Sequence, residues 1–467
     1  MPKFSHPFIP NSSDEIKESM LKELNLESLD DLFKDLPADL VKDKIEGLPG
    51  PHSEYETFCH FREELSKNLS FFDLPSFLGG GVWPHWVPAA VKSIVMRSEF
   101  YTSYTSYQPE ISQGMLQALF EAQSLICELL DMEVAVVSHY DWATSLAEAV
   151  LMSYRITRRR EVIVPESINP DRLNVVKTYA SPHGISVKTV RFDREIGQLD
   201  LADLESKVSQ DTAAVYVENP SFLGVVEEGV FEIGQLAHEK DALFIVGVDP
   251  ISLGLIVPPG KYDADIVVGE GQPLGNPMNY GGPLFGIMAC KDRKDLIRQL
   301  PGRLIGMTTT IDGKERAFCM VLQTREQHIR RERATSNICT NEALCALAAA
   351  VYLSLLGSNG MKALCETIAY NSHYLAKKLA EIPGVISPRF KAPFFKEFVV
   401  TIEGGGKTVK ELNDFLLENG IHGGIPLVDI FPDLGESELI CVTEMHLKAH
   451  LDKLCSLVEK YMGGSHV

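Results

Sequence analysis

Residues Asp263 to Gly286 read D-A-D-I-V-V-G-E-G-Q-P-L-G-N-P-M-N-Y-G-G-P-L-F-G, and the rest of the chain is organised around them. The pattern predicts a buried strand over Ile266–Gly271, then a turn rich in glycine and proline. A second apolar strand runs back through Leu284–Cys290. Just upstream, another apolar strand, Leu243–Val248, ends on an acid, Asp249. Asp249 follows one buried strand, and the glycine-rich turn follows the next. If the two strands are parallel neighbours, both lie at the same edge of the sheet.

Short apolar strands alternate with helices through the middle of the chain. The predicted strands are Val134–Ser138, Val162–Pro165, Ser186–Val190, Ala213–Val217, Leu243–Val248, Ile266–Gly271 and Leu284–Cys290. This alternation predicts an α/β fold with a mostly parallel, doubly wound sheet. Ligands of such sheets bind at the carboxyl ends of the strands.

Three polar groups stand at predicted strand ends: S-H-Y-D-W-A-T-S at Ser138–Ser145, Asn219 in E-N-P and Asp249 in V-D-P. Enzymes of the aminotransferase type that use pyridoxal phosphate (PLP) place their cofactor groups in this way. A helix N-terminus holds the phosphate, an asparagine reaches the phenolic oxygen, an acid holds the ring nitrogen and a lysine forms the Schiff base.

The lysine is missing from this chain. No lysine occurs between Lys261 and Lys291, and the position expected to carry it falls at about Gln272 or Pro273. Lys261 and Lys291 are predicted at the opposite end of the sheet, roughly 17 to 20 Å away. The sequence therefore predicts a PLP-enzyme scaffold that cannot hold the cofactor covalently. Without the lysine, Asn219 and Asp249 are better interpreted as vestigial groups that cap strand ends.

The predicted phosphate helix is also unusual. Thr144 or Ser145 could cap it, but Tyr140, Asp141 and Trp142 crowd its entrance. An acid at that place repels a phosphate dianion, and a tryptophan leaves less room for it.

A tyrosine stripe precedes the long helix predicted from Met115. It reads F-Y-T-S-Y-T-S-Y-Q-P-E-I-S-Q-G, Phe100–Gly114, and includes Tyr104, Tyr107 and Gln108. The stripe could be packing, or a loop that lines a polar cleft. In folds of this type the corresponding segment commonly crosses a dimer interface, so a partner's active site is the second interpretation.

Two stretches near the N-terminus leave alternatives open. Ser12 and Glu15 predict a capping box, and Ile16, Met20 and Leu24 share one face of the helix that follows. This arm either packs on its own chain or embraces a partner subunit. The stretch F-L-G-G-G-V-W-P-H-W-V-P, Phe77–Pro88, is either a loop beside a ligand or a crossover that packs into the core.

Three domains are predicted: an N-terminal helical arm over 1–75, a large α/β domain over 76–335 and a small α+β domain over 336–467. Thr340 or Asn341 is predicted to cap a long helix that ends near Gly357 and Gly360. The small domain then continues with the predicted elements Glu397–Ile402 (strand), Val409–Glu418 (helix), Leu439–Thr443 (strand) and a last helix.

Composition excludes several classes of function. The net charge of −20 argues against nucleic acid or an anionic membrane as partner. Nine cysteines form no C-x-x-C pair, which favours reduced thiols. His446 and His450 share a helix face without a third ligand nearby, so no metal site is predicted. No apolar run approaches a membrane span, and a cytoplasmic protein is expected.

Long motifs carry a resemblance to a known family. They are Y-Q-P-E-I-S-Q-G, G-E-G-Q-P-L-G, G-G-P, Q-L-P-G-R, R-E-Q-H-I-R-R-E and T-S-N-I-C-T-N. Nearly along its full length the chain resembles subunit 1 of the two-subunit glycine dehydrogenases (decarboxylating), the P-proteins of the glycine cleavage system. It departs from the family at Trp142, where a glycine is usual, and at His139 and Ser106.

The resemblance implies a fold like that of the PLP-dependent transferases (aminotransferase fold type I). It implies a heterotetramer in which subunit 2 carries the PLP lysine, so this chain alone is expected to be inactive. The complex would decarboxylate glycine and pass the aminomethyl group to the lipoyl arm of H-protein, within a system that includes T-protein and L-protein. In this chain no catalytic or cofactor-binding residue is expected, and Tyr104, Tyr107 and Gln108 are expected to face the partner's site.

Two other interpretations stay open. The chain could be a self-sufficient PLP enzyme that uses an unexpected lysine. It could also be a non-catalytic scaffold or regulatory paralogue of a PLP enzyme.

Overall fold

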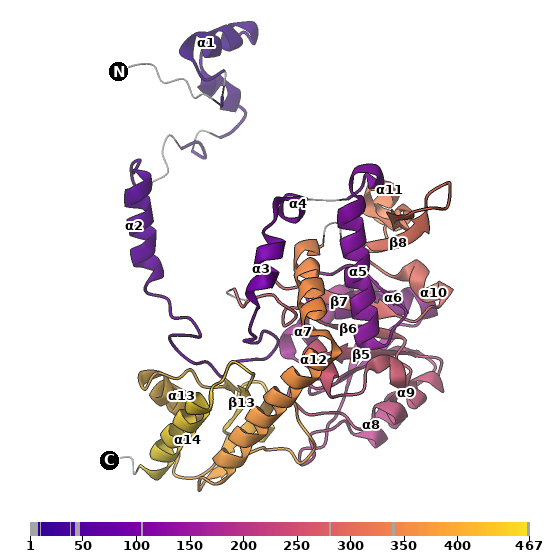
Figure 1. Ribbon diagram of the computed structural model, residues 1–467, viewed down its shortest axis with the longest axis vertical. Coiled ribbons are helices and arrows are strands. Elements are labelled where there is room, and N and C mark those ends of the chain that lie inside the picture. The colour runs from indigo at the N-terminus through magenta and orange to yellow at the C-terminus, as the bar shows by residue number, and fades with distance from the viewer. Residues whose placement is uncertain are drawn as a thin grey trace. The chain divides into compact units, whose positions relative to one another are not determined.

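In the computed structural model, seven strands form the central sheet in the order β1-β7-β6-β5-β4-β2-β3. Figure 1 labels β5, β6 and β7 of this sheet. The bounds of the seven strands are β1 Val134–Ala135, β2 Glu161–Pro165, β3 Ser186–Val190, β4 Thr212–Glu218, β5 Leu243–Val248, β6 Ile266–Glu270 and β7 Gly286–Cys290. Strands β2 to β6 pair in parallel, and β7 runs antiparallel to both β6 and β1. The predicted mostly parallel sheet is confirmed, and only β1 is markedly shorter than predicted.

Helices cover both faces of this sheet because its strands alternate apolar side chains between two cores. Val246 of β5 faces one core, and its neighbour Ile245 faces the other. The first core is closed by α5 Gln113–Leu130, α8 Leu201–Lys207, α9 Val230–His238 and α12 Ala343–Ala380. The second core is closed by α6 Trp142–Thr157, α7 Pro170–Ala180 and α10 Lys294–Gln299.

The described residues are 8–9, 11–37, 39–42, 47–103, 106–279, 282–338 and 341–464. They divide into two units, Met1–Leu69 and Ser70–Val467. The first unit holds α1 Asp14–Glu23, η1 Leu29–Phe33 and α2 Glu54–Leu65. Ser13 caps α1 by accepting a hydrogen bond from the Ile16 amide, so the predicted cap at Ser12 is wrong by one residue.

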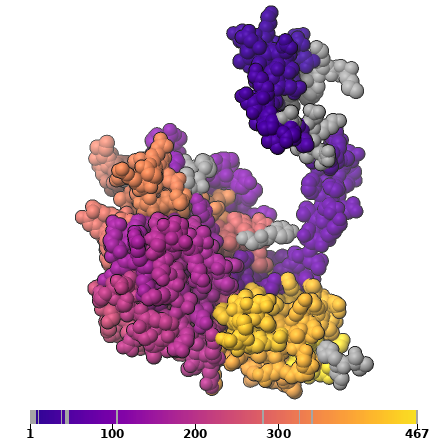
Figure 2. All heavy atoms as spheres, turned by 180° about the vertical axis from the view of Figure 1, so that it is seen from behind, coloured from indigo at the N-terminus to yellow at the C-terminus, as the bar shows by residue number. Residues whose placement is uncertain are grey.

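The C-terminal residues form a smaller lobe beside the large domain, which Figure 2 shows in orange and yellow. Its antiparallel sheet has the order β10-β11-β13-β12. The lobe's elements after α12 are β10 Val385–Ile386, β11 Glu397–Ile402, α13 Val409–Glu418, β12 Ile425–Pro426, η8 Pro432–Leu434, β13 Ser437–Cys441 and α14 Lys448–Gly463. The predicted small α+β domain is confirmed as a fold, whereas its predicted limit at residue 336 stays a prediction.

Helix α12 is long and apolar enough to cross a membrane, which corrects the expectation that no apolar run approaches that length. Its apolar side chains, such as Ala346, Leu353 and Ile368, are buried in the first core, so it is a core helix. Gly357 interrupts it with non-helical φ and ψ of 58° and −175°, at the predicted break. Its N-cap is Glu342 rather than Asn341, and Thr340 lies outside the described residues.

Several elements escaped the sequence analysis, among them α2 and a two-stranded hairpin of β8 Leu304–Thr309 and β9 Arg316–Val321. Short helical turns complete the chain. They are α3 Ala89–Val95, α4 Ser98–Tyr101, η2 Pro109–Ile111, η3 Ser181–His183, η4 Pro250–Gly254, η5 Pro259–Tyr262, η6 Gln323–Arg325, α11 Gln327–Arg330 and η7 Arg331–Arg333.

The stretch Phe77–Pro88, called here the crossing segment, packs into the core. The Phe77 amide donates to the His422 carbonyl at 2.9 Å, and the Phe77 carbonyl accepts from the Cys441 amide at 2.9 Å. Phe77 and Trp83 are both buried. The crossover interpretation is therefore the right one, and the segment joins the large domain to the C-terminal domain.

The glycines of the crossing segment permit this close packing. A Cβ at Gly79 would collide with the Glu397 carboxylate and lie 2.7 Å from the Cys441 Cβ. The amide of Gly80, whose φ is +76°, donates to Glu397 Oε1 at 2.6 Å.

We predict that Gly79→Ala lowers the free energy of unfolding by about 1–3 kcal/mol, because the surrounding backbone and the buried carboxylate must shift. Urea unfolding of the full chain measures this change. Gly114→Ala is the matched control, since a Cβ there meets nothing within 4 Å and alanine is the better helix former. Equal stability of the two variants would contradict the close packing of the crossing segment.

Candidate functional site

The predicted strand-end residues Asn219 and Asp249 follow directly on the carboxyl ends of the adjacent strands β4 and β5. Both are buried. The Asn219 side chain accepts from the Glu227 amide at 3.1 Å, and Asp249 accepts from the Ile251 amide at 3.1 Å. Each residue therefore does cap its strand end, as predicted, although Asp249 has a further partner.

Gln272, one of the two residues predicted at the lysine position, uses its side chain for structure. Its Oε1 accepts from the Trp83 amide at 3.1 Å, and its Nε2 donates to the Trp83 carbonyl at 3.2 Å. The amide thus anchors the crossing segment and supplies no nucleophile. Lys261 pairs with Asp131 at 3.1 Å and Lys291 with Asp263 at 2.6 Å, so both lie at the opposite end of the sheet, as predicted.

One lysine does reach this site, and the sequence analysis missed it. Lys396 comes from the start of β11 in the C-terminal domain and is 1% exposed. Its Nζ lies 2.6 Å from Asp249 Oδ2 and 3.5 Å from the centre of the Trp83 ring. The available signal was a lysine inside the apolar run F-F-K-E-F-V-V, where an unpaired charge would be unfavourable.

The N-terminus of α6 is occupied by carboxylates of the chain itself. Asp141, rather than the predicted Thr144 or Ser145, is the N-cap, and its Oδ1 accepts from the Thr144 amide at 2.7 Å. Glu270, at the end of β6, accepts from the Trp142 amide at 3.2 Å. Burial raises the pKa of Glu270 to about 8. The amides that would bind a phosphate in a PLP enzyme are thus partly taken.

Trp142, the departure from the family pattern, fills the space above these strand ends. It is 3% exposed, and its Nε1 donates to the Tyr216 hydroxyl at 3.1 Å. The guanidinium of Arg172 stacks 3.5 Å from the centre of the indole ring and pairs with Glu218 at 2.7 Å. The rings of Trp142 and Trp83 and the ion pairs Arg172–Glu218 and Lys396–Asp249 therefore fill the carboxyl ends of β4 and β5, where ligands of such sheets bind.

These residues do not fit PLP. Asp249, which would hold the ring nitrogen, is paired with Lys396, and the helix amides face Asp141 and Glu270. The cavity among Trp83, Trp142 and their neighbours has room for about one water molecule. Lys396 contacts Asp249, the acid that would bind the nitrogen of the PLP ring. A Schiff-base lysine must instead reach the aldehyde, which is on the opposite side of that ring.

The tyrosine stripe forms a second polar cluster. Tyr107 is 40% exposed, and its hydroxyl accepts from Arg303 Nη2 at 3.0 Å. The ring of His328 stands edge-on to it, with ring centres 5.8 Å apart. Gln108 is exposed beside Tyr107, and Tyr104 lies outside the described residues. Whether this cluster faces a partner's site stays a prediction.

The other departures from the family pattern are core residues. His139 is fully buried, and burial lowers its pKa to about 4. Its Nε2 lies 3.3 Å from the Pro301 carbonyl. Ser106 is buried beside Arg303. His446, considered above for a metal, is held by the Ser76 carbonyl at 2.9 Å and the Thr443 amide at 3.0 Å.

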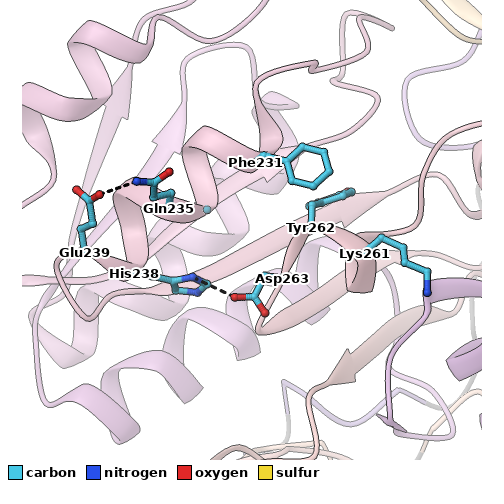
Figure 3. Close-up of a pocket in the computed structure, with 8 residues that line it drawn as sticks. Phe231, Gln235, His238, Glu239, Lys261, Tyr262 and Asp263 are labelled. Atoms are coloured by element: carbon cyan, nitrogen blue, oxygen red, sulfur yellow. Dashed lines mark hydrogen bonds and ion pairs between the residues drawn. The ribbon is translucent and has the colours of Figure 1, made fainter.

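An open hollow on the surface lies between α9 and η5, at the amino ends of the strands (Figure 3). His238 points into it and pairs with Asp263 at 3.5 Å and Asp265 at 2.8 Å. The hollow is at the end of the sheet opposite to Asp249. It therefore has no part in the site described above.

Comparisons with known proteins show which family the chain is similar to. The family model described as glycine cleavage system P-protein matches residues 6–458. A protein of Staphylothermus marinus described as probable glycine dehydrogenase (decarboxylating) subunit 1 is 51% identical, over 96% of this chain and 97% of the relative. A protein of Aeropyrum pernix with the same description is 49% identical, over 98% of this chain and 100% of the relative.

Solved structures show the same fold. A crystal structure of glycine decarboxylase (P-protein) of the glycine cleavage system, in inhibitor-bound form, aligns with a TM-score of 0.86 and 39% identity, over 98% of this chain and 100% of that chain. Glutamate decarboxylase of Lactobacillus brevis, 11% identical, aligns with a TM-score of 0.68 over 92% of this chain and 98% of that one, which shows the fold alone. The predicted fold of PLP-dependent transferases of type I is confirmed, and the chain belongs to the P-protein family of the glycine cleavage system.

Proposed function

We propose that this chain is the subunit of glycine decarboxylase that carries no PLP. Together with a subunit 2 that holds the cofactor, it would decarboxylate glycine and pass the aminomethyl group to the lipoyl arm of H-protein. The observation that carries the proposal is Gln272 at the lysine position, with Lys396 paired to Asp249. When bound in subunit 2, PLP would supply the electron sink for loss of carbon dioxide.

The proposed partners of the chain are taken from its family. Relatives described as subunit 1 support a partner called subunit 2, and we propose a heterotetramer of the two. T-protein and L-protein would complete the system in the cytoplasm. This chain's own task would be to complete the cleft, position the lipoyl arm and exclude water.

The tyrosine cluster supplies groups suited to that task. Because the Tyr107 hydroxyl accepts from Arg303, its own hydrogen is directed to a different acceptor. Arg303 is buried and fixes the phenol, whereas Tyr107 and Gln108 are exposed. We propose that Tyr104, Tyr107 and Gln108 line the partner's active site, where they orient the substrate or the lipoyl arm.

The N-terminal unit supports assembly with a partner. No residue of α1, η1 or α2 is buried. On α2, Tyr55, Phe58 and Phe61 are 75%, 61% and 58% exposed. Isolated helices of about this length are marginal in water, so such apolar faces need a surface to cover them. We propose that subunit 2 supplies it.

A second candidate function is a non-catalytic scaffold or a regulatory paralogue that only stabilises subunit 2. The closed pocket favours this function as much as the first, because neither requires a cofactor in this chain. A self-sufficient PLP enzyme is disfavoured, since Lys396 and Asp249 neutralise each other.

Carbon exchange between glycine and bicarbonate separates these functions. We predict exchange, with PLP and lipoylated H-protein present, only when this chain and subunit 2 are mixed, because only the mixture has both a cofactor and a complete cleft. Full exchange by subunit 2 alone would favour the scaffold. Exchange by this chain alone would overturn the assignment of the cofactor to subunit 2.

The double variant Tyr104→Phe/Tyr107→Phe should lower decarboxylation by the assembled complex about tenfold, the effect of losing one or two hydrogen bonds in the transition state. Gel filtration should show that the complex still forms. Tyr101→Phe, an exposed tyrosine of the same stripe, is the matched control. Unchanged turnover by an intact complex would remove these tyrosines from the site.

A further inference from the structure

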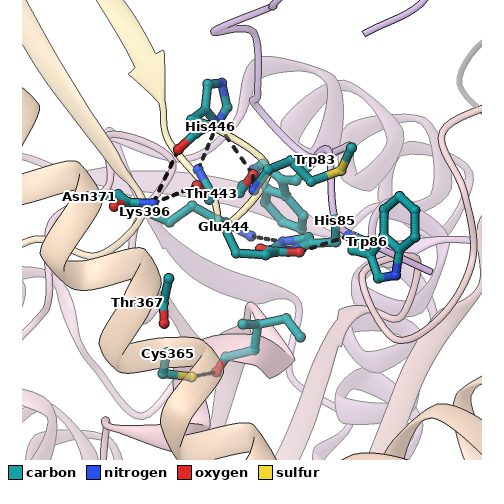
Figure 4. Close-up of polar contacts among 12 residues, drawn as sticks. Trp83, His85, Trp86, Cys365, Thr367, Asn371, Lys396, Thr443, Glu444 and His446 are labelled. Carbon is teal, nitrogen blue, oxygen red and sulfur yellow. Dashed lines mark hydrogen bonds and ion pairs between the residues drawn. The ribbon is translucent and has the colours of Figure 1, made fainter. Parts of the chain in front are cut away.

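A set of buried charges at the closed pocket has no part in the proposed function. It consists of Asp249, Lys396, His85 and Glu444, called here the charged clamp. Figure 4 labels Lys396, His85 and Glu444. Lys396 Nζ is 2.6 Å from Asp249 Oδ2 and 3.4 Å from His85 Nε2. His85 Nδ1 lies 2.9 Å from Glu444 Oε2.

The donors and acceptors of the clamp follow one consistent order. An ammonium group only donates, so His85 Nε2 must accept from Lys396. His85 Nδ1 then carries the hydrogen and donates to Glu444. Glu444 Oε1 in turn accepts from the Trp86 amide at 2.7 Å. The clamp is therefore a continuous chain of hydrogen bonds and ion pairs from Asp249 to Trp86.

The clamp joins three parts of the chain that are distant in sequence. Asp249 ends β5 of the large domain, His85 belongs to the crossing segment, and Lys396 and Glu444 belong to the C-terminal domain. Figure 4 shows the residues of the crossing segment and of the C-terminal domain converging on one another. A change in the position of either domain would break at least one of these buried contacts.

The backbone at Lys396 is a second, independent observation. Its φ is +64°, in the left-handed region that a residue with a long side chain seldom adopts. Such a conformation persists only where the surroundings hold it in place. Here the Lys396 carbonyl accepts from the Val442 amide at 2.9 Å, while the side chain reaches Asp249 in the other direction.

We infer that the charged clamp fixes the C-terminal domain against the large domain, and that the Lys396 ammonium takes the place, beside Asp249, of the cationic ring nitrogen of PLP enzymes. The pocket is then an internal fastening rather than a ligand site. The clamp thereby holds the two domains of this chain in one relative position. The inference concerns the isolated chain and holds whether or not the division of labour proposed above is right.

A thermal double-mutant cycle on the isolated full chain tests the pair. Lys396→Met leaves the Asp249 carboxylate buried without its cation, and Asp249→Asn leaves the ammonium without its anion. Each should lower Tm by at least about 5 °C, and the double variant should lower it by clearly less than the sum of the two. Lys391→Met is the control, because Lys391 pairs with Glu195 on the surface and should change Tm by no more than about 1 °C.

Hydrogen exchange tests the fastening of the domains and keeps the inference testable if a lysine variant does not fold. Glu444→Gln is a milder change that weakens the link to His85 and Trp86. It should speed exchange of the Trp86 amide at least about tenfold, whereas the amides of α5 stay unchanged. Additive Tm losses, or unchanged exchange at Trp86, would overturn the clamp. The result of the glycine–bicarbonate carbon exchange assay with subunit 2 affects neither the Tm values nor the hydrogen exchange rates measured here.

Discussion

The carboxyl ends of β4, β5 and β6 carry buried acidic side chains, each of which needs a partner within the chain. Lys396 lies against Asp249, Arg172 against Glu218, and the amides at the start of α6 against Asp141 and Glu270. A buried carboxylate that lacks its partner is strongly unfavourable, so each of these pairs fixes the elements that bring it together. The crossing segment, the start of β11 and the loop after β13 are all held at this point.

Under the proposal that subunit 2 alone carries the cofactor, this constraint would explain how a fold of the PLP-dependent transferases serves in this chain. The fold supplies an acid at the end of β5 and a helix N-terminus nearby. In this chain an ammonium group from the C-terminal domain meets the acid, and carboxylates meet the helix amides. Trp83 and Trp142 occupy the remaining volume. The pocket is filled by buried aromatic and charged side chains, and the exposed polar groups Tyr107 and Gln108 lie elsewhere.

The sequence predicted the sheet well because buried parallel strands have a strong local signal. The run Leu243–Val248 coincides with β5, all of whose residues are buried, and the missing lysine was visible by simple inspection. The closed pocket was not predictable in the same way. Lys396 and Asp249 are 147 residues apart in the sequence, and no residue pattern near Asp249 indicates that a lysine pairs with it. The hairpin of β8 and β9 was missed because its first strand changes from buried residues at Leu304 and Ile305 to exposed residues from Met307 to Thr309, so β8 has neither a continuous apolar run nor an alternation.

The most direct measurement of the central claim is the location of the cofactor in the assembled complex. Reduction with borohydride attaches PLP permanently to the lysine that holds it, and mass spectrometry of the digested subunits identifies that lysine. The account predicts a pyridoxyl group on subunit 2 and on no lysine of this chain. A pyridoxyl group on Lys396 would show that the pocket opens to the cofactor, and would contradict the account.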